Sequence, residues 1–540
     1  MKRYWRLGFL ALLACSSAPG FADEAEELRT LRDSTINLVN ALVEQKVLTR
    51  DKADAIIAQA LKARAKGADG ARGADGAGPA AAPGVVRVPY VPETVKQEIA
   101  KEVKQDVLAQ AKTERWGEPG AFPDWLRRFN WYGDVRLRAE ADRFPPGTSA
   151  NASVAELQAY GVNIANSTAA NNRLRFRSRF GFDAIVGDTV TAGIRVSSGG
   201  VGSGSNAGSE NQTIGNYSTR SAVGFDRAYI SYHPWSWLEA SGGRLGNPFF
   251  KPTTLIWADD LSLEGVVLNV HPNFGPRLMW FTTAGAFPIL QVDPTPGNSA
   301  KSKWLYGFQT GVDLRFTQSS GLRLAAALYD YRHIEGIPNS STVVTDYSSS
   351  AAPFRQTGNT VFDVNGLLNT QNGTQNYLYG LASKFHEANV SASLDLGFVG
   401  PTHIIIDGDW VKNLGFNSTE IEQRTGYQVN RQVKGWQTRV SVGYPTMQQK
   451  NAWQAYVGYR YAQRDSTVDA FTEQDFHLGG TDAQGYYLGV RYALEKNTFV
   501  NLRWFSAKQI DGVELAGADS SASGLPLAID VAQLDLVASF

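Results

Sequence analysis

The chain has 540 residues, of which 19% are charged, and its 52 basic residues match its 52 acidic ones. This balance gives no strong overall field and points away from nucleic acid as a partner. Cys15 is the single cysteine, so the chain beyond it has no thiol for a disulfide or a thiolate metal site. The length fits several soluble domains or one large barrel, and the residue pattern has to decide between them.

The first residues resemble a secretory signal peptide. Basic residues within 2–6 precede an apolar stretch at 7–14 and a small-residue cleavage site at 20–22. We expect residues 1–22 to be removed, which leaves 49 basic against 52 acidic residues, a net charge of −3. Within this segment, Leu12-Leu13-Ala14-Cys15 also resembles a lipoprotein cleavage box, which would make Cys15 a lipid-anchored first residue. No later stretch reaches the ~20 uncharged residues that a membrane-spanning helix needs.

A helical stalk is predicted next. Residues 23–66 lack glycine and proline and carry leucines at heptad-like spacing, which fits a short coiled coil or a single amphipathic helix. Residues 67–92 are rich in glycine, alanine and proline. They include four triplets with glycine first, as in collagen, but without proline inside the triplets, which favours a flexible linker. A second helix is predicted over 93–116. We expect this N-terminal segment to lie in the periplasm.

From residue 131 onward apolar and polar residues alternate, which is the signature of a strand with one face in an apolar medium and one in a polar medium. In 173–184 four arginines share one face while leucine and phenylalanine share the other, and four arginines cannot face a dry core. Alternating segments recur at 131–141, 173–184, 190–198, 223–232, 238–245, 263–271, 277–286, 303–316, 322–332, 377–397, 403–412, 435–444, 453–464, 484–493, 498–508 and 528–540.

These sixteen segments, joined by alternately short and long connections, predict an all-β fold. We expect a 16-stranded antiparallel transmembrane β-barrel over 131–540, with short periplasmic turns and long external loops, preceded by the α-helical or coiled-coil stalk. The alternation slips within 377–397, which we interpret as one long strand with a bulge because two strands would break the even count. Aromatic residues near strand ends suit the interfacial girdles of such barrels.

The last strand ends at Phe540, and a terminal aromatic on an alternating strand resembles the signal read by the barrel assembly machinery. We therefore expect that machinery, outer-membrane lipid and lipopolysaccharide as partners.

Four motifs in order resemble the bacterial putative porin family. They are Arg87-Val88-Pro89-Tyr90-Val91-Pro92 leading into Trp116-Gly117, Gly133-Asp134-Val135-Arg136-Leu137-Arg138, Trp257-Ala258-Asp259-Asp260 followed by Glu264-Gly265, and Asp407-Gly408-Asp409-Trp410-Val411-Lys412-Asn413-Leu414-Gly415. The resemblance covers nearly the whole mature chain, including the N-terminal helical segment. It implies an outer-membrane porin of a Gram-negative bacterium but identifies no solute, so the pore has to be interpreted from its residues.

The face opposite the apolar one is predicted to line the lumen with fourteen basic and seven acidic side chains. The acidic ones are Asp134, Glu140, Asp183, Glu239, Asp313, Asp407 and Asp409, and the basic ones are Arg136, Arg138, Arg173, Arg175, Arg177, Arg179, Arg195, Arg227, Arg315, Arg323, Arg439, Arg460, Arg491 and Arg503. Fixed charges of one sign in a narrow pore concentrate the opposite ion. Our hypothesis is passive diffusion of small hydrophilic solutes with a preference for anions. Alternatively, the arginines solvate the wall and pair with neighbouring acids.

The third long connection, at 246–262, is expected to fold inward and narrow the lumen with Lys251, Trp257, Asp259 and Asp260. Its acids would then face the arginines of the first three strands and set up a transverse field. The alternative is an ordinary surface loop.

Other functions have weaker support in the sequence. The six histidines lie apart with no serine and carboxylate constellation, and no phosphate-cradling glycine motif precedes a helix, so we expect no enzyme, cofactor or metal site. Energised siderophore receptors usually have about 22 strands and a folded plug. The alternative function is structural: the helical stalk would tether the cell wall or join barrels into the homotrimer that we expect.

Overall fold

A computed structural model describes residues 126–146, 170–202, 205–293, 301–339, 350–354, 356–366, 378–512, 516 and 527–540. All of them belong to the compact unit Arg115–Phe540. The expected signal peptide, Cys15, the two helical segments and the linker therefore lie outside the described residues. No helix in the described ranges is long and apolar enough to cross a membrane.

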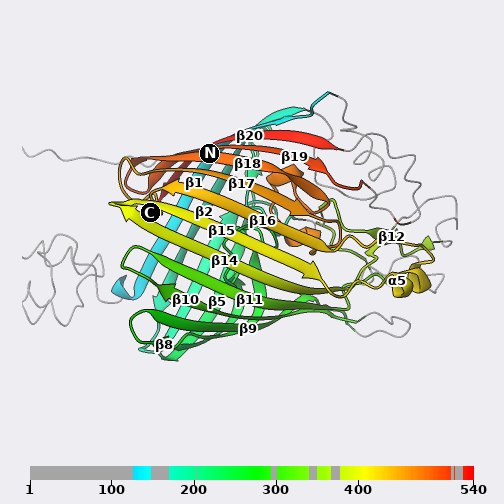
Figure 1. Ribbon diagram of the computed structural model, residues 1–540, viewed down its shortest axis with the longest axis horizontal. Helices are drawn as coiled ribbons and strands as arrows, with labels where there is room; N and C mark the ends of the chain where they lie inside the picture. The colour runs from blue at the N-terminus through cyan, green and yellow to red at the C-terminus, as the bar shows by residue number, and fades with distance from the viewer. Residues whose placement is uncertain are drawn as a thin grey trace, which may run out of the picture. The chain divides into compact units, whose positions relative to one another are not determined.

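Sixteen long antiparallel strands close into a barrel in the described part of the chain (Figure 1). They are β1 (Phe129–Arg143), β2 (Asn171–Ile185), β3 (Val190–Ser198), β5 (Val223–Trp235), β6 (Leu238–Gly246), β7 (Ser262–Val270), β9 (Leu278–Leu290), β10 (Lys303–Arg315), β11 (Gly321–Arg332), β14 (Phe385–Val399), β15 (Thr402–Asn413), β16 (Lys434–Gly443), β17 (Trp453–Ala462), β18 (Ala483–Glu495), β19 (Thr498–Gln509) and β20 (Ala528–Ser539). Each overlaps one predicted segment, so the predicted closed 16-stranded barrel is confirmed.

The barrel closes where the last strand meets the first. β20 pairs antiparallel with β1, from Asp134 opposite Ser539 to Arg143 opposite Asp530. Phe540 continues the ladder, because its N–H donates to the carbonyl of Gly133 at 3.0 Å and the Gly133 N–H donates to its carbonyl at 3.1 Å. A closed barrel leaves no unpaired strand edge, which lipid would not tolerate.

The interpretation of 377–397 as one bulged strand is wrong. Its first part is β13 (Tyr379–Leu381), which pairs with β12 (Val361–Asp363) in a separate two-stranded sheet, and the barrel strand β14 begins only at Phe385. The slip in alternation is therefore the junction of two elements. The even count survives because β12 and β13 both lie within one long connection.

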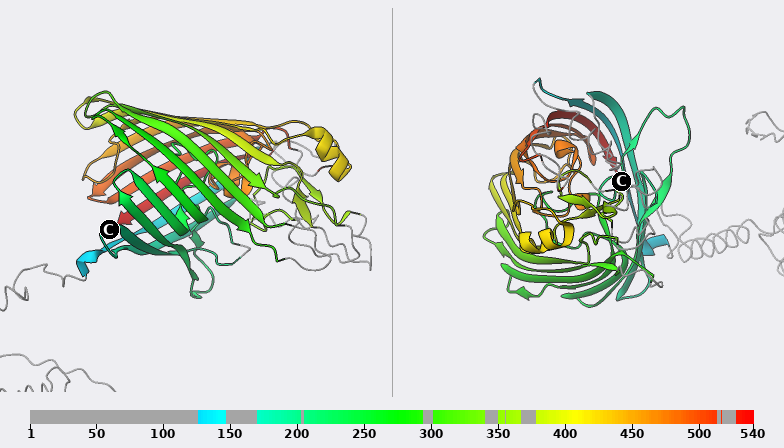
Figure 2. Two further views of the ribbon diagram at one scale, coloured as in Figure 1. Left: turned by 90° about the horizontal axis from the view of Figure 1, so that it is seen from below. Right: turned by 90° about the vertical axis from the view of Figure 1, so that its right-hand side faces the viewer.

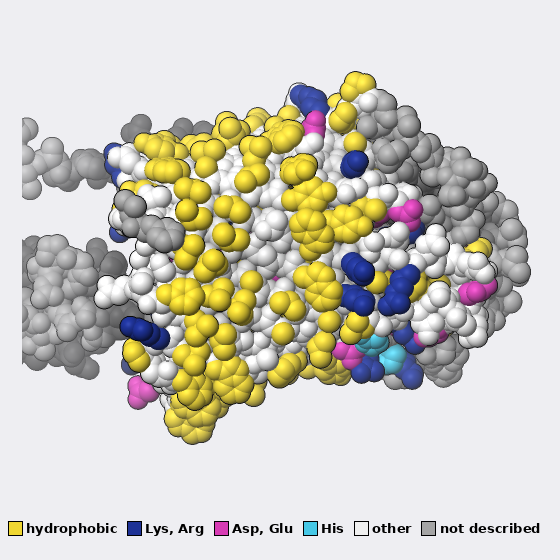
Figure 3. Space-filling view, in the orientation of Figure 1, with side chains coloured by type: hydrophobic (Ala, Val, Ile, Leu, Met, Phe, Trp, Pro, Cys, Tyr) yellow, Lys and Arg dark blue, Asp and Glu magenta, His cyan; other side chains and the backbone are white. Residues whose placement is uncertain are grey.

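The alternation separates an apolar outer face from a polar inner face. In β1, Val135 and Leu137 are 43% and 49% exposed, whereas Arg138 is 2% exposed. Hydrophobic side chains cover the strands on the face shown in Figure 3, while basic and acidic side chains gather toward the two ends. Several exposed tryptophans lie near strand ends, among them Trp131 and Trp453, and Trp235 and Trp237 stack with ring centroids 5.4 Å apart. This distribution is typical of a wall that faces lipid.

Short connections join the strands at one end of the barrel, the turn end, and long ones at the other, the loop end (Figure 1). The long connections include L3 (residues 247–261), L5 (333–384) and L7 (463–482). Two short strands add to the edges of wall strands: β4 (Gln212–Thr213) pairs with β2 and β8 (Asn273–Phe274) with β9. The other short elements are η1 (Leu126–Arg128), β12 and β13 in L5, α5 (Ser418–Thr425), and η4 (Asp469–Phe471) and η5 (Phe476–Leu478) in L7.

Candidate functional site

The inner wall at β1 and β2 is built from facing arginines. The register sets Arg136 opposite Arg177 and Arg138 opposite Arg175. Like charges directly opposite one another destabilise a sheet unless acids separate them. Two acids of β1 do so: Asp134 accepts from Arg177 Nη2 at 2.8 Å and from Arg179 Nε at 2.5 Å. Glu140, at the other end of this arginine run, accepts from Arg173 Nε at 2.5 Å.

Most of the predicted lumen arginines lie within ion-pair distance of a carboxylate. In the described residues ten of the fourteen do so: Arg138, Arg173, Arg175, Arg177, Arg179, Arg195, Arg227, Arg315, Arg439 and Arg503. Arg315 lies apart from the others near the turn end, with its side chain 62% exposed. Pairing with neighbouring acids, the alternative weighed from the sequence, therefore describes most of this set.

Four of the fourteen, Arg136, Arg323, Arg460 and Arg491, have no carboxylate partner among the described residues. Arg136 Nη2 donates to Asn211 Oδ1 at 2.6 Å. Arg323 lies between the rings of Phe250 and Phe281, 4.3 and 4.4 Å from their centroids.

Arg460 is 1% exposed and donates to the carbonyls of Leu255 and Gly480 at 3.4 and 3.0 Å. Arg491 lies 5.4 Å from the ring centroid of Tyr456. These four side chains are thus the predicted lumen arginines that neutral groups or aromatic rings contact in place of a carboxylate.

L3 lies inside the barrel. Its Thr253 donates from N and Oγ1 to Asp409 of β15, at 3.0 and 2.6 Å, and its Phe250 N–H donates to Gln309 of β10 at 2.7 Å. At its far end Asp260 Oδ1 accepts from Arg177 of β2 at 2.8 Å and from Arg179 at 3.4 Å. Hydrogen bonds to three strands, β15, β10 and β2, place the loop across the lumen.

The four L3 residues singled out from the sequence divide into two kinds. Trp257 is 1% exposed and packs edge-to-face on Tyr329, with ring centroids 5.1 Å apart, so it anchors the loop and does not line a passage. Lys251 and Asp259 form an ion pair with each other. Together with Asp260 they line the cavity described below.

L7 also folds into the barrel, which the sequence analysis missed. Asp465, Ser466, Thr467 and Thr472 are fully buried. Figure 2, in its right-hand view, shows orange ribbon of this region within the ring of strands. L7 touches L3 where the Ala258 N–H donates to the Phe471 carbonyl at 2.8 Å. One available signal was its content of apolar residues, five between 468 and 478, which is unusual for an external loop.

The tip of L7 is held by arginines. Asp475 accepts from Arg138 Nη1 at 2.9 Å, from Arg503 Nη2 at 2.8 Å and from Gln533 Nε2 at 2.9 Å. Burial opposes ionisation of Asp475, but Arg138 and Arg503 outweigh it and hold its pKa well below the usual range. Burial and the carboxylate of Asp475 raise the pKa of Glu473 to about 7.

A cavity of about 470 Å³ lies between L3, L7 and the wall of β1, β2 and β18 to β20. Its lining carries six basic side chains, Arg136, Arg177, Arg179, Lys251, Arg491 and Arg503, and five acidic ones, Asp259, Asp260, Glu473, Asp475 and Asp535. The acids of the two loops thus lie in one space with the arginines of the wall. We name this space the constriction cavity.

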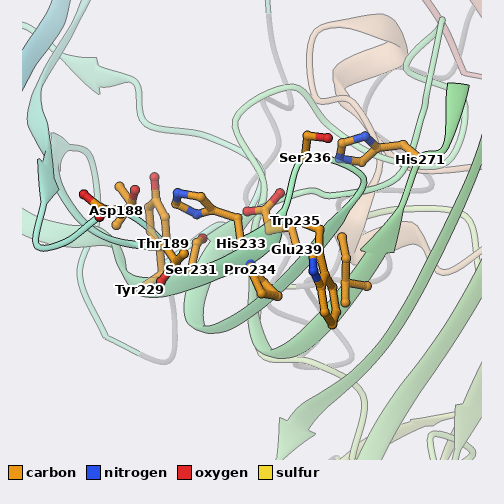
Figure 4. A pocket seen from close by; sticks show the side chains of 12 residues that line it. Asp188, Thr189, Tyr229, Ser231, His233, Pro234, Trp235, Ser236, Glu239 and His271 are labelled. Carbon is orange, nitrogen blue, oxygen red and sulfur yellow. The ribbon is translucent and has the colours of Figure 1, made fainter.

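A second cavity, of about 580 Å³, lies at the turn end (Figure 4). His233, His271, Asp188 and Glu239 line it, and no lysine or arginine does. In the part of the chain that the structure describes, no three or more histidine, aspartate or glutamate side chains are placed to hold a metal ion. The lining of this second cavity therefore differs from that of the constriction cavity, which is rich in arginine.

No curated protein matches the chain significantly. Among solved structures, the outer membrane channel DcaP of Acinetobacter baumannii is 13% identical at a TM-score of 0.39, with 76% of this chain and 97% of that chain covered.

OprB of Pseudomonas putida is 11% identical at a TM-score of 0.44, with 79% and 97% covered. The trimer form of OmpT, an outer membrane protein of Vibrio cholerae, is 11% identical at a TM-score of 0.38, with 76% and 99% covered.

These structural similarities are too weak to assign a family, whereas the comparison with family models assigns one. Residues 32–540 match the model of a family described as putative porin, which confirms the resemblance stated from the motifs. A match over nearly the whole chain, on a closed barrel with an apolar outer face, points to a channel of the outer membrane and not to an enzyme. The chain belongs to the putative porin family.

Proposed function

We propose that the protein lets small hydrophilic solutes diffuse passively across the outer membrane and that it prefers anions. The observation that carries this proposal is the constriction cavity, where L3 and L7 leave a polar space against an arginine-lined wall. A solute that passes through this cavity is exposed to the fixed charges of its lining.

The anion preference depends on which charges remain uncompensated. The lining has six basic and five acidic side chains, a formal excess of one positive charge. The excess grows when Glu473 is protonated, and burial raises the pKa of that carboxyl to about 7. Arg136 and Arg491, which have no carboxylate partner among the described residues, are the side chains we assign to the preference.

Reversal potentials across planar bilayers test this assignment. Under a KCl gradient the wild type should give a potential of the sign set by chloride. Arg136→Glu and Arg491→Glu should each shift it toward the potassium side, whereas reversal of Arg332, a paired arginine at the exposed end of β11, should leave it unchanged. A cation-selective wild type would refute the proposed preference.

We also propose that the channel is a homotrimer, that the loop end faces the exterior and that the N-terminal segment lies in the periplasm. The alternative, a tether whose stalk joins barrels or binds the cell wall, predicts a specific outcome. Deletion of residues 23–92 would then abolish the trimer and leave single-pore conductance intact. Native mass spectrometry and bilayer recording of the same preparation distinguish the two roles, since a diffusion channel alone would keep its oligomeric state.

A further inference from the structure

The constriction cavity concentrates hydrogen-bond donors that have no partner. Within the described residues, Nε of Arg136, Arg491 and Arg503 and Nε2 of Gln474 are buried and donate no hydrogen bond. All four side chains line the cavity. Buried unpaired donors are rare in native proteins and costly for the folded state. Their convergence on one space indicates that the space is built to receive hydrogen-bond acceptors.

The neighbouring Arg138 shows which acceptor fits such a guanidinium on this wall. Its Nε donates to Asp535 Oδ1 at 2.7 Å and its Nη2 to Asp535 Oδ2 at 3.2 Å, so one edge of the fork holds both oxygens of a carboxylate. The opposite side of the same guanidinium holds Asp475 through Nη1 at 2.9 Å. This two-point geometry matches planar carboxylates and not spherical ions.

The same fork is only half used at Arg136. Its Nη2 donates to the neutral oxygen of Asn211 at 2.6 Å, and its Nε is unpaired. Arg136 lies two residues from Arg138 on the same face of β1, with Arg177 opposite it. The nearest fixed carboxylates of β1, Asp134 and Glu140, are taken by the arginines of β2.

Arg491 is in a similar state on β18. Its Nη1 lies 3.5 Å from the amide oxygen of Gln454, a distance at the limit of a hydrogen bond. Its guanidinium is otherwise packed 5.4 Å from the ring centroid of Tyr456. Two guanidinium groups from opposite sides of the β19–β20 pair thus line one cavity, and neither has a carboxylate partner in the described ranges.

We propose that the constriction cavity is a binding site for the carboxylate group of a small organic anion, held by Arg136 and Arg491. This inference rests on the proposed anion preference and goes beyond it, because a site retains its solute whereas fixed charge only raises the local concentration of every anion. A carboxylate can accept from two N–H groups of one guanidinium with its two oxygens, as Asp535 does at Arg138, whereas chloride offers a single acceptor atom.

Bilayer recordings of the full chain with sodium gluconate as the probe test the proposal. Gluconate added to a constant chloride background should reduce the chloride current along a saturating curve. The double variant Arg136→Gln/Arg491→Gln should weaken this block at least tenfold, while Arg332→Gln keeps the wild-type curve. The heat-dependent shift in gel mobility shows beforehand that each variant forms a folded barrel.

The outcomes separate the site from the channel function. A current that falls in simple proportion to gluconate, or a saturating block that the double variant leaves unchanged, overturns the binding site. If the wild type is anion-selective but shows no saturating block, only the site is refuted. If it is cation-selective and still shows a saturating block that the double variant loses, the site stands and the proposed anion preference falls.

Discussion

The replacement Asn359→Ala tests how L7 is held inside the barrel. Asn359 of L5 is fully buried. Its Nδ2 donates to the carbonyls of Arg464 and Thr467, each at 2.8 Å, and its Oδ1 accepts from the Asp469 N–H at 2.8 Å. One side chain thus satisfies three backbone groups of the first half of L7.

Alanine would remove the printed partner of the Thr467 carbonyl and of the Asp469 N–H, whereas the Arg464 carbonyl would still accept from the Thr481 hydroxyl at 2.5 Å. Each unpaired group costs about 1–3 kcal/mol, so the local opening free energy of L7 should fall by roughly 3 kcal/mol even if water satisfies some of them. About 1.4 kcal/mol corresponds to a factor of ten, so amide exchange in L7 should accelerate by roughly two orders of magnitude.

Hydrogen exchange followed by mass spectrometry on the folded barrel measures this effect in peptides that cover 463–482. The matched control is Asn417→Ala, which removes the one side-chain hydrogen bond that caps α5, from the Glu420 N–H at 3.3 Å. That cap is worth about 1 kcal/mol and should change exchange only near α5. Unchanged exchange of L7 in Asn359→Ala would refute the reasoning.

Three further predictions concern pH, assembly and stability. Burial lowers the pKa of His477 in L7 from 6.5 to about 4. Protonation of this imidazole therefore favours the open state, so L7 should keep its full stability above pH 6.5 and lose up to about 3 kcal/mol as the pH falls to 4. Exchange measured along that pH range should show the loss, and His477→Gln should flatten it. Deletion of Phe540, whose backbone extends the closing seam, should lower the amount of assembled barrel without altering ion selectivity; normal barrel levels would count against this role. Arg138→Gln should destabilise the barrel by about 3–5 kcal/mol, because Asp475 and Asp535 lose their shared buried partner. Arg332→Gln breaks an exposed pair and should cost less than about 1 kcal/mol, so equal thermal shifts of the two variants would contradict the argument.

The strands were predictable because the information that specifies them is local. Alternation with a period of two follows from the pleat, and one face in lipid with the other in water imposes it on each segment separately. The error at 377–397 arose where that local rule met a nonlocal fact: Tyr379–Leu381 pairs with Val361–Asp363 inside L5.

The assignment of the arginines to the lumen remains a prediction from the same local rule, and no local pattern in the sequence indicated their ion-pair partners. Arg138 meets Asp475, a residue 337 positions away. L3 could be singled out by its order in the chain, whereas L7 has no periodicity that shows where it folds.

The sequence by itself determined the number of strands, their inward and outward faces and the family, because each depends on neighbours in the chain or on motifs in order. Only the tertiary structure decided that two loops fold inward and that ten of the fourteen predicted lumen arginines lie near carboxylates. It also decided that Arg136 and Arg491 have no carboxylate partner among the described residues and that their Nε atoms donate no hydrogen bond. Hydrogen bonds and ion pairs between residues far apart in the chain have no local pattern, so they exist only once the barrel has closed and brought its walls and loops together.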